Sequence, residues 1–184
     1  MLRGNKELWW ALGAGIVITI IYGAVVYFTR AITAAGELFG HGLGILGFVL
    51  MLMTEILYSL RKRTRSASWG KMASWLQFHI FTGLVGPYMV LLHTSWKFNG
   101  LAGVTTLFTL IIVVSGFIGR YIYTRIPRTL DGLEIEGTLS ESALRQARRL
   151  MALWHTVHIP IGMVLFVSAF VHIGGAIYYA TLLR

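Results

Sequence analysis

Apolar residues occur along this chain in five long stretches. They cover residues of about 8–29, 38–60, 73–96, 101–123 and 151–183. A helix needs about 20 predominantly apolar residues to cross the hydrocarbon core of a bilayer, and each stretch is long enough. The pattern therefore predicts an all-α integral membrane protein with five transmembrane helices.

Composition supports a membrane location. Hydrophobic residues make up 56% of the 184 residues and charged residues only 12%, and the mean hydropathy is +0.70. Soluble globular domains are less apolar and carry about 25% charged residues, so that class is excluded. The longest connection between spans is 124–150. We therefore expect a single membrane domain over 1–184, with 124–150 as a connector.

The first apolar stretch could also be a cleaved signal peptide, because it follows Arg3 and Lys6 and precedes small residues at 31–35. The hydrophobic region of a signal peptide has only about 7–15 residues. The stretch at 8–29 is longer than that, so we interpret it as a true transmembrane span.

The formal net charge of +9 is distributed unevenly between the two ends of the predicted spans. Three basic residues fall on one side: Arg30, Lys97 and Arg184. The other thirteen fall on the opposite side: Arg3, Lys6, Arg61, Lys62, Arg63, Arg65, Lys71, Arg120, Arg125, Arg128, Arg145, Arg148 and Arg149. Cytoplasmic loops of membrane proteins carry the excess of Lys and Arg. The asymmetry predicts an inner-membrane protein whose N-terminus and connector at 124–150 lie on the cytoplasmic side. Topology thus explains the basic residues, and we expect no nucleic-acid partner.

Four of the six histidines belong to a repeated pattern, H-x3-G-x9-H. It occurs as His79, Gly83 and His93 in the third span and as His158, Gly162 and His172 in the fifth. A fourteen-residue step returns a helical side chain to within about 40° of the same face, about 21 Å further along the axis. The glycine adds a patch without a side chain one turn from the first histidine. Two such helices are suited to hold two flat metal macrocycles.

The topology fixes which histidines would pair. The third and fifth spans both start on the cytoplasmic side, so we expect His79 with His158 at an inner haem iron, and His93 with His172 at an outer one. Iron with two axial imidazoles has no open position for oxygen and favours electron transfer. His155, one turn before His158, is an alternative ligand. However, a step of seventeen residues places His172 about 100° around the helix from His155, so these two side chains would not share a face.

The absence of cysteine restricts the cofactor. It excludes iron–sulfur ligation, zinc thiolate sites and the covalent attachment of c-type haem. We therefore expect two non-covalent b-type haems within a four-helix-type bundle. A structural or proton-relay role for the histidines, in a haem-free anchor or transporter, is the competing interpretation.

Three further residues are candidates for cofactor contact. Gly86 is seven residues from each histidine of the third span and so lies on the ligand face between the two haem depths. Lys97 and Arg120 lie at the outer and inner ends of their spans, where each could neutralise a haem propionate. An interfacial anchor is the alternative role for Lys97.

A quinone is a further candidate ligand. Glu55 lies within the second span, where an ionisable residue is costly and suggests a function, although it could instead pair with Arg61. His41, near the outer end of the same span, could line a quinone site or be a solvated interfacial residue. Glycines crowd this half of the span, as helix packing or haem contact would require.

At its histidine motifs the chain resembles the ferric-reductase-like transmembrane domain, the haem-carrying part of NADPH oxidases and ferric reductases. The resemblance covers about 73–183 and implies haem ligands on the third and fifth spans. Cytochrome b of bc complexes uses the same fourteen-residue step on other spans. No glycine-rich dinucleotide fingerprint follows a strand pattern here, so the resemblance implies electron transfer without the family's flavin domain.

These observations predict a di-haem cytochrome b subunit of an oxidoreductase complex, which carries electrons across the inner membrane. Its donor and acceptor would be partner subunits such as flavin, iron–sulfur or cytochrome c proteins, with membrane lipid around it. The alternative is a quinol-oxidising or quinone-reducing cytochrome with its own quinone site. Whether the chain is itself an enzyme stays open.

Overall fold

The computed structural model describes residues 5–64, 70–126 and 140–182. Within these ranges the chain forms five α-helices and no strand: α1 (Lys6–Thr29), α2 (Leu38–Arg63), α3 (Met72–His93), α4 (Gly100–Thr124) and α5 (Glu141–Leu182). All five are long and apolar enough to span a membrane. The prediction of an all-helical, multi-pass membrane protein with five spans is therefore confirmed at this level.

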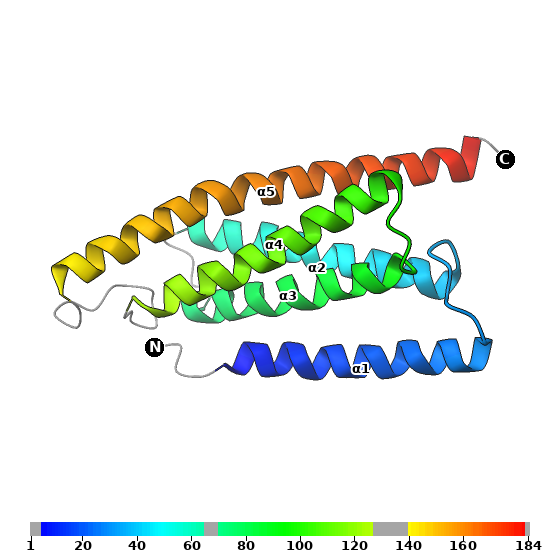
Figure 1. Ribbon diagram of the computed structural model, residues 1–184, viewed down its shortest axis with the longest axis horizontal. Helices are drawn as coiled ribbons and strands as arrows, with labels where there is room; N and C mark the ends of the chain where they lie inside the picture. Colours follow the sequence, from blue (N-terminus) through cyan, green and yellow to red (C-terminus); the bar gives the residue numbers. More distant parts are fainter. Residues whose placement is uncertain (1–4, 65–69, 127–139, 183–184) are drawn as a thin grey trace.

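The helices lie along one common direction and alternate in polarity (Figure 1). As a result, α1, α3 and α5 run one way and α2 and α4 the other, so α3 and α5 are parallel, as expected for the third and fifth of five successive spans. Large apolar side chains cover the outside of the bundle; Phe28, for example, is 81% exposed. Such a surface is suited to lipid.

Two helix boundaries differ from the predicted spans. The third span was expected to reach residue 96, but α3 ends at His93 because Ser95 and Trp96 have positive φ angles of 51° and 61°. The fifth helix starts well before its span, at Glu141, where the Ser140 hydroxyl accepts a hydrogen bond from the Ala143 amide at 3.3 Å. The T-x-x-E pattern of Thr138 and Glu141 predicts such an early start, and Thr138, with the rest of residues 127–139 of the predicted connector, lies outside the described residues.

The closest helix pair is α2 with α3. A Cβ on Gly47 would lie 2.8 Å from the carbonyl oxygen of Gly86, and a Cβ on Gly86 would lie 2.9 Å from that of Gly47. Only glycine allows these backbones to approach so closely. Further along the pair, the buried Thr54 hydroxyl donates to the Thr82 hydroxyl at 2.6 Å. These contacts make α2 and α3 a firmly packed antiparallel hairpin.

The fifth helix packs mainly on α4. Within the described ranges, no Cα atom of α5 comes within 8 Å of a Cα atom of α2 or α3. Directly packed helices have axes about 8–10 Å apart, so α5 stands away from the α2–α3 hairpin. Side chains reach across this space, as between the rings of Phe48 and Phe170, whose centroids are 5.4 Å apart.

Candidate functional site

Both histidines of α3 are bound to backbone carbonyls of α2. The Nδ1 atom of His79 lies 3.1 Å from the carbonyl oxygen of Thr54, and the Nδ1 atom of His93 lies 2.8 Å from that of Gly40. A carbonyl oxygen can only accept, so the hydrogen of each neutral ring is on Nδ1. This leaves the lone pair on Nε2, the arrangement in which a second-shell carbonyl orients a metal-binding imidazole.

The two acceptors on α2 repeat the spacing of the histidines. Gly40 and Thr54 are fourteen residues apart, as are His79 and His93. Because α2 and α3 are antiparallel, the Thr54 carbonyl lies beside His79 at one depth and the Gly40 carbonyl lies beside His93 at the other. His79 and His93 are both half-buried.

His158 is oriented by two side chains. Its Nδ1 atom lies 2.9 Å from the Ser115 hydroxyl of α4. Its ring stacks on the indole of Trp154, with centroids 4.5 Å apart and an interplanar angle of 28°. The Trp154 indole donates in turn to the Ser115 carbonyl oxygen at 2.7 Å. Ser115 therefore ties both rings to α4.

The predicted histidine pairs are neighbours across the space between α3 and α5. His158 lies within range for electrostatic interaction with His79, and His172 lies within such range of His93. His155 packs against Trp154, with ring centroids 4.8 Å apart. His172 has no hydrogen-bond partner among the described residues. The four motif histidines thus form two sets at two depths.

The glycines of the two motifs are not required by contacts within the protein. A Cβ on Gly83 would lie 3.5 Å from Thr54 Cγ2, and a Cβ on Gly162 would lie 3.9 Å from Ile112 Cδ1. Both distances are ordinary van der Waals contacts. The lack of a side chain at these positions is consistent with close approach of a flat ligand beside each first histidine.

The other glycine positions have clearer packing roles. Gly86, predicted to face the cofactor, packs against Gly47 of α2. A Cβ on Gly44 would lie 2.8 Å from the Cγ and Nδ1 atoms of His93. Gly44 therefore makes room for the His93 imidazole beside α2, and the glycines of α2 serve both helix packing and histidine placement.

The two predicted propionate partners have different surroundings. Lys97 is exposed in the segment that follows α3. Arg120 is half-buried near the end of α4, and its guanidinium donates to Glu7 at 2.5 and 3.1 Å and to the Asn5 side chain at 3.1 Å. The guanidinium is thus committed to α1 and the residue before it.

The residues suggested for a quinone site lie on the surface of α2. His41 is exposed, and its ring centroid is 6.5 Å from that of His93. Glu55 is exposed and accepts a hydrogen bond from the Ser59 hydroxyl at 3.3 Å. The Arg61 guanidinium, suggested as its partner, donates to two nearby backbone carbonyls.

Sequence reasoning missed the groups that orient the imidazoles. Every residue has a backbone carbonyl, so the sequence does not mark those of Gly40 and Thr54 as acceptors. Their fourteen-residue spacing matches that of the histidines only once the register of α2 against α3 is known. Ser115 is a common residue type in apolar spans, and its position on another helix gives no sign of His158. Trp154 lies four residues before His158, and this helical spacing could have indicated the stacking of the two rings.

Among the described residues, no group of three or more His, Asp or Glu side chains could hold a bare metal ion. A pair of axial imidazoles is a different donor set, since a macrocycle supplies the remaining ligands of its iron. Comparison with protein families, with curated proteins and with solved structures gives no match.

Proposed function

We propose that this protein is a di-haem b-type cytochrome that carries electrons across a membrane. One observation carries the proposal. Four histidines stand as two neighbouring pairs on parallel helices, and both imidazoles of α3 are bonded through Nδ1 to carbonyls, which leaves Nε2 for iron. A structural role would not require that the same arrangement be built twice, fourteen residues apart.

The residues of the chain fit the group that they would hold. His79 and His158 would bind the inner haem, and His93 and His172 the outer one. Each haem, when bound, would accept and release one electron at a six-coordinate iron with little change in geometry. Gly83 and Gly162 would leave space for the ring edges, and Ser115 with the carbonyls of α2 would keep the imidazoles in place before the cofactor binds.

The charge distribution supports an orientation. With thirteen of sixteen basic residues at one end, we place the N-terminus in the cytoplasm and the C-terminus on the opposite face of the inner membrane. The chain is then one membrane domain, in which α2 to α5 form a four-helix bundle around the haems and α1 packs outside against α3.

The redox partners follow from this arrangement. An electron that enters near His79 and leaves near His93, or the reverse, must be supplied and removed by other groups at the two membrane faces. We propose partner subunits with flavin, iron–sulfur or c-type haem centres, with lipid around the remaining surface. The basic residues are explained by topology, so nucleic acid is not expected as a partner.

Absorption spectroscopy of the purified protein tests the proposal. We expect b-type bands in the reduced-minus-oxidised spectrum and two non-covalent haems per chain after extraction. A preparation from a haem-sufficient host that is monodisperse but has no haem bands would refute the proposal. Such a result would favour a haem-free anchor or transporter.

A further inference from the structure

Two pairs of residues on α4 and α5, each separated by about one helical turn, fit together near the inner end of the bundle. Ser115 and Gly119 lie four residues apart on α4, and Trp154 and His158 lie four residues apart on α5. Because α4 and α5 are antiparallel (Figure 1), Gly119 lies against Trp154 and Ser115 against His158. We call these four residues the Trp154 cluster.

Gly119 provides the space that the indole of Trp154 occupies. It is buried, and a Cβ at this position would overlap Cε2 and Cζ2 of the indole and lie 2.7 Å from its Nε1 atom. The same Nε1 atom donates to the carbonyl oxygen of Ser115 at 2.7 Å. The indole is thus fixed in a notch without a side chain, and any larger residue at position 119 must displace it.

The fixed indole holds the imidazole of His158 by its face. The two rings are 4.5 Å apart between centroids, with an interplanar angle of 28°. The Ser115 hydroxyl holds an edge of the same imidazole, 2.9 Å from Nδ1, which leaves Nε2 for iron. A side chain that is already held in its bound orientation loses little freedom on binding. His158 is therefore prepared for its role as a ligand before the cofactor binds.

His155 is the competing histidine of α5. It precedes His158 by three residues, so it lies about 4.5 Å along the helix and about 60° around it. Its ring contacts the indole of Trp154 at a tilt of 56°, with centroids 4.8 Å apart. His158 lies within electrostatic range of both His155 and His79. Both histidines of α5 are thus close enough to the inner site to compete for one haem.

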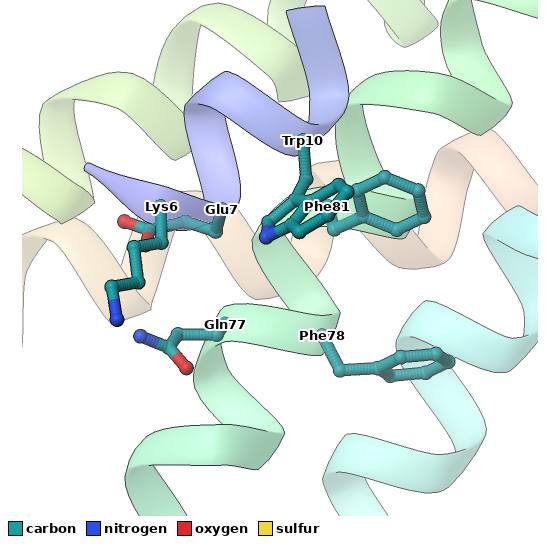
Figure 2. Close-up of a pocket in the computed structure, with 6 residues that line it drawn as sticks. All are labelled: Lys6, Glu7, Trp10, Gln77, Phe78 and Phe81. Carbon is teal, nitrogen blue, oxygen red and sulfur yellow. The ribbon is translucent and has the colours of Figure 1, made fainter. Parts of the chain in front are cut away.

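The end of α4 that carries Gly119 is anchored through α1 to α3. Arg120, the next residue, donates to the buried carboxylate of Glu7. Figure 2 shows Glu7 on the first turn of α1, across a pocket from Phe78 of α3. His79 follows Phe78 in the chain, so the ion pair limits the movement of Gly119 relative to the other inner ligand.

We propose that Trp154, held in the notch at Gly119, makes His158 rather than His155 the α5 ligand of the inner haem. This inference rests on the proposed function, because it concerns the choice of a haem ligand. Trp154 and Gly119 are positioning residues that act through His158. When the indole is displaced, the His158 ring is released and His155 binds the haem in a fraction of the molecules.

Electron paramagnetic resonance of the oxidised full-length protein tests this choice. The low-spin ferric signal depends on the two axial imidazoles and on the angle between their planes. In Gly119→Ala we expect the inner haem to give two low-spin species, while the outer signal stays unchanged. His155→Ala alone should leave both signals and both reduction potentials unchanged. A native inner signal in Gly119→Ala, or an altered one in His155→Ala, would overturn the proposal.

The double variant Gly119→Ala/His155→Ala separates ligand exchange from a general disturbance of the site. It should lose the second inner species and transfer its inner haem to apomyoglobin about 10-fold faster than the unmodified protein, as is typical for loss of a second-shell contact. A second species that persists without His155 would refute the proposal. Trp154→Leu removes the indole without a new side chain at position 119 and should give the same two species as Gly119→Ala.

Gly174→Ala is the matched control for a glycine replacement within a helix. Gly174 is exposed on α5, and a Cβ at this position would meet no atom within 4 Å, so both signals should stay native. A split inner signal in this variant would show that the notch at Gly119 is not the cause and would contradict the proposal.

Haem content of the same samples separates this inference from the proposed function. Two haems per chain with a native inner signal in both Gly119→Ala and Trp154→Leu would retain the cytochrome and refute the role of Trp154. Monodisperse unmodified protein without haem would refute the cytochrome and, with it, the choice of ligand.

Discussion

The Nδ1–H group of His93 donates a hydrogen bond to the backbone carbonyl of Gly40, with 2.8 Å between nitrogen and oxygen. The same contact recurs fourteen residues away between His79 and Thr54. A carbonyl within a helix moves only with its helix, so both imidazoles are held by the α2–α3 hairpin. The ligand positions are therefore set by helix packing as well as by the histidines themselves.

The histidine pairs make the first prediction. His79→Ala and His158→Ala should each remove the inner haem, and His93→Ala and His172→Ala the outer haem. Haem content should fall from two per chain to one in every case. Redox titration and electron paramagnetic resonance should show that the two variants of one histidine pair retain the same haem. His41→Ala should retain both haems, and a different remaining haem for the two members would refute the pairing.

Gly44 makes the second prediction. In Gly44→Ala the new Cβ would lie 2.8 Å from the His93 ring, so the imidazole must move away from Gly40. We expect loss of the outer haem with retention of the inner one, measured by haem extraction and redox titration. Gly42→Ala is the matched control, because its Cβ meets no atom within 4 Å. Equal haem contents in the two variants would contradict this account.

Ser115 makes the third prediction. Ser115→Ala removes the hydroxyl that lies 2.9 Å from His158 Nδ1. Loss of a second-shell partner typically costs about 10–100-fold in metal affinity, so the inner haem should dissociate faster in transfer assays to apomyoglobin. In Ser168→Ala the lost hydroxyl bonds only to the carbonyl of Leu165 on its own helix. That control should leave the transfer rate unchanged, and a slow rate in both would refute the role of Ser115.

The ion pair between Arg120 and Glu7 makes the fourth prediction. Removal of one partner from a buried pair typically costs about 3–5 kcal/mol, so Arg120→Gln should lower the unfolding temperature of the protein in detergent by several degrees. Arg145→Gln removes an exposed pair with Glu141 on α5, which should matter little because exposed pairs contribute about 0–1 kcal/mol. Similar unfolding temperatures for the two variants would contradict the stabilising role.

The sequence predicts the helices of this fold well because one physical requirement dominates. Twenty consecutive apolar residues must form a helix in lipid, where every backbone group needs an internal partner. The boundaries depend on local geometry instead. Nothing in the composition of residues 94–96 indicates that Ser95 and Trp96 adopt positive φ angles and end α3 at His93.

The candidate site is predictable only in part. The spacing of His79, His93, His158 and His172 places the rings on two faces at two depths, and the structure brings them together as neighbours. The packing role of Gly86 depends on the register of α2 against α3. The spacing of Gly86 from the histidines does not reveal this register. The partners of Arg120 come from residues more than a hundred positions away, a contact that no local pattern encodes.

Electron transfer through the membrane tests the central proposal most directly. The protein is reconstituted into liposomes that contain ferricyanide, and dithionite is added outside. We predict that the internal ferricyanide is reduced faster than in protein-free liposomes, and that His93→Ala abolishes the difference. A rate equal to that of protein-free liposomes, with both haems present and reducible, would contradict the account.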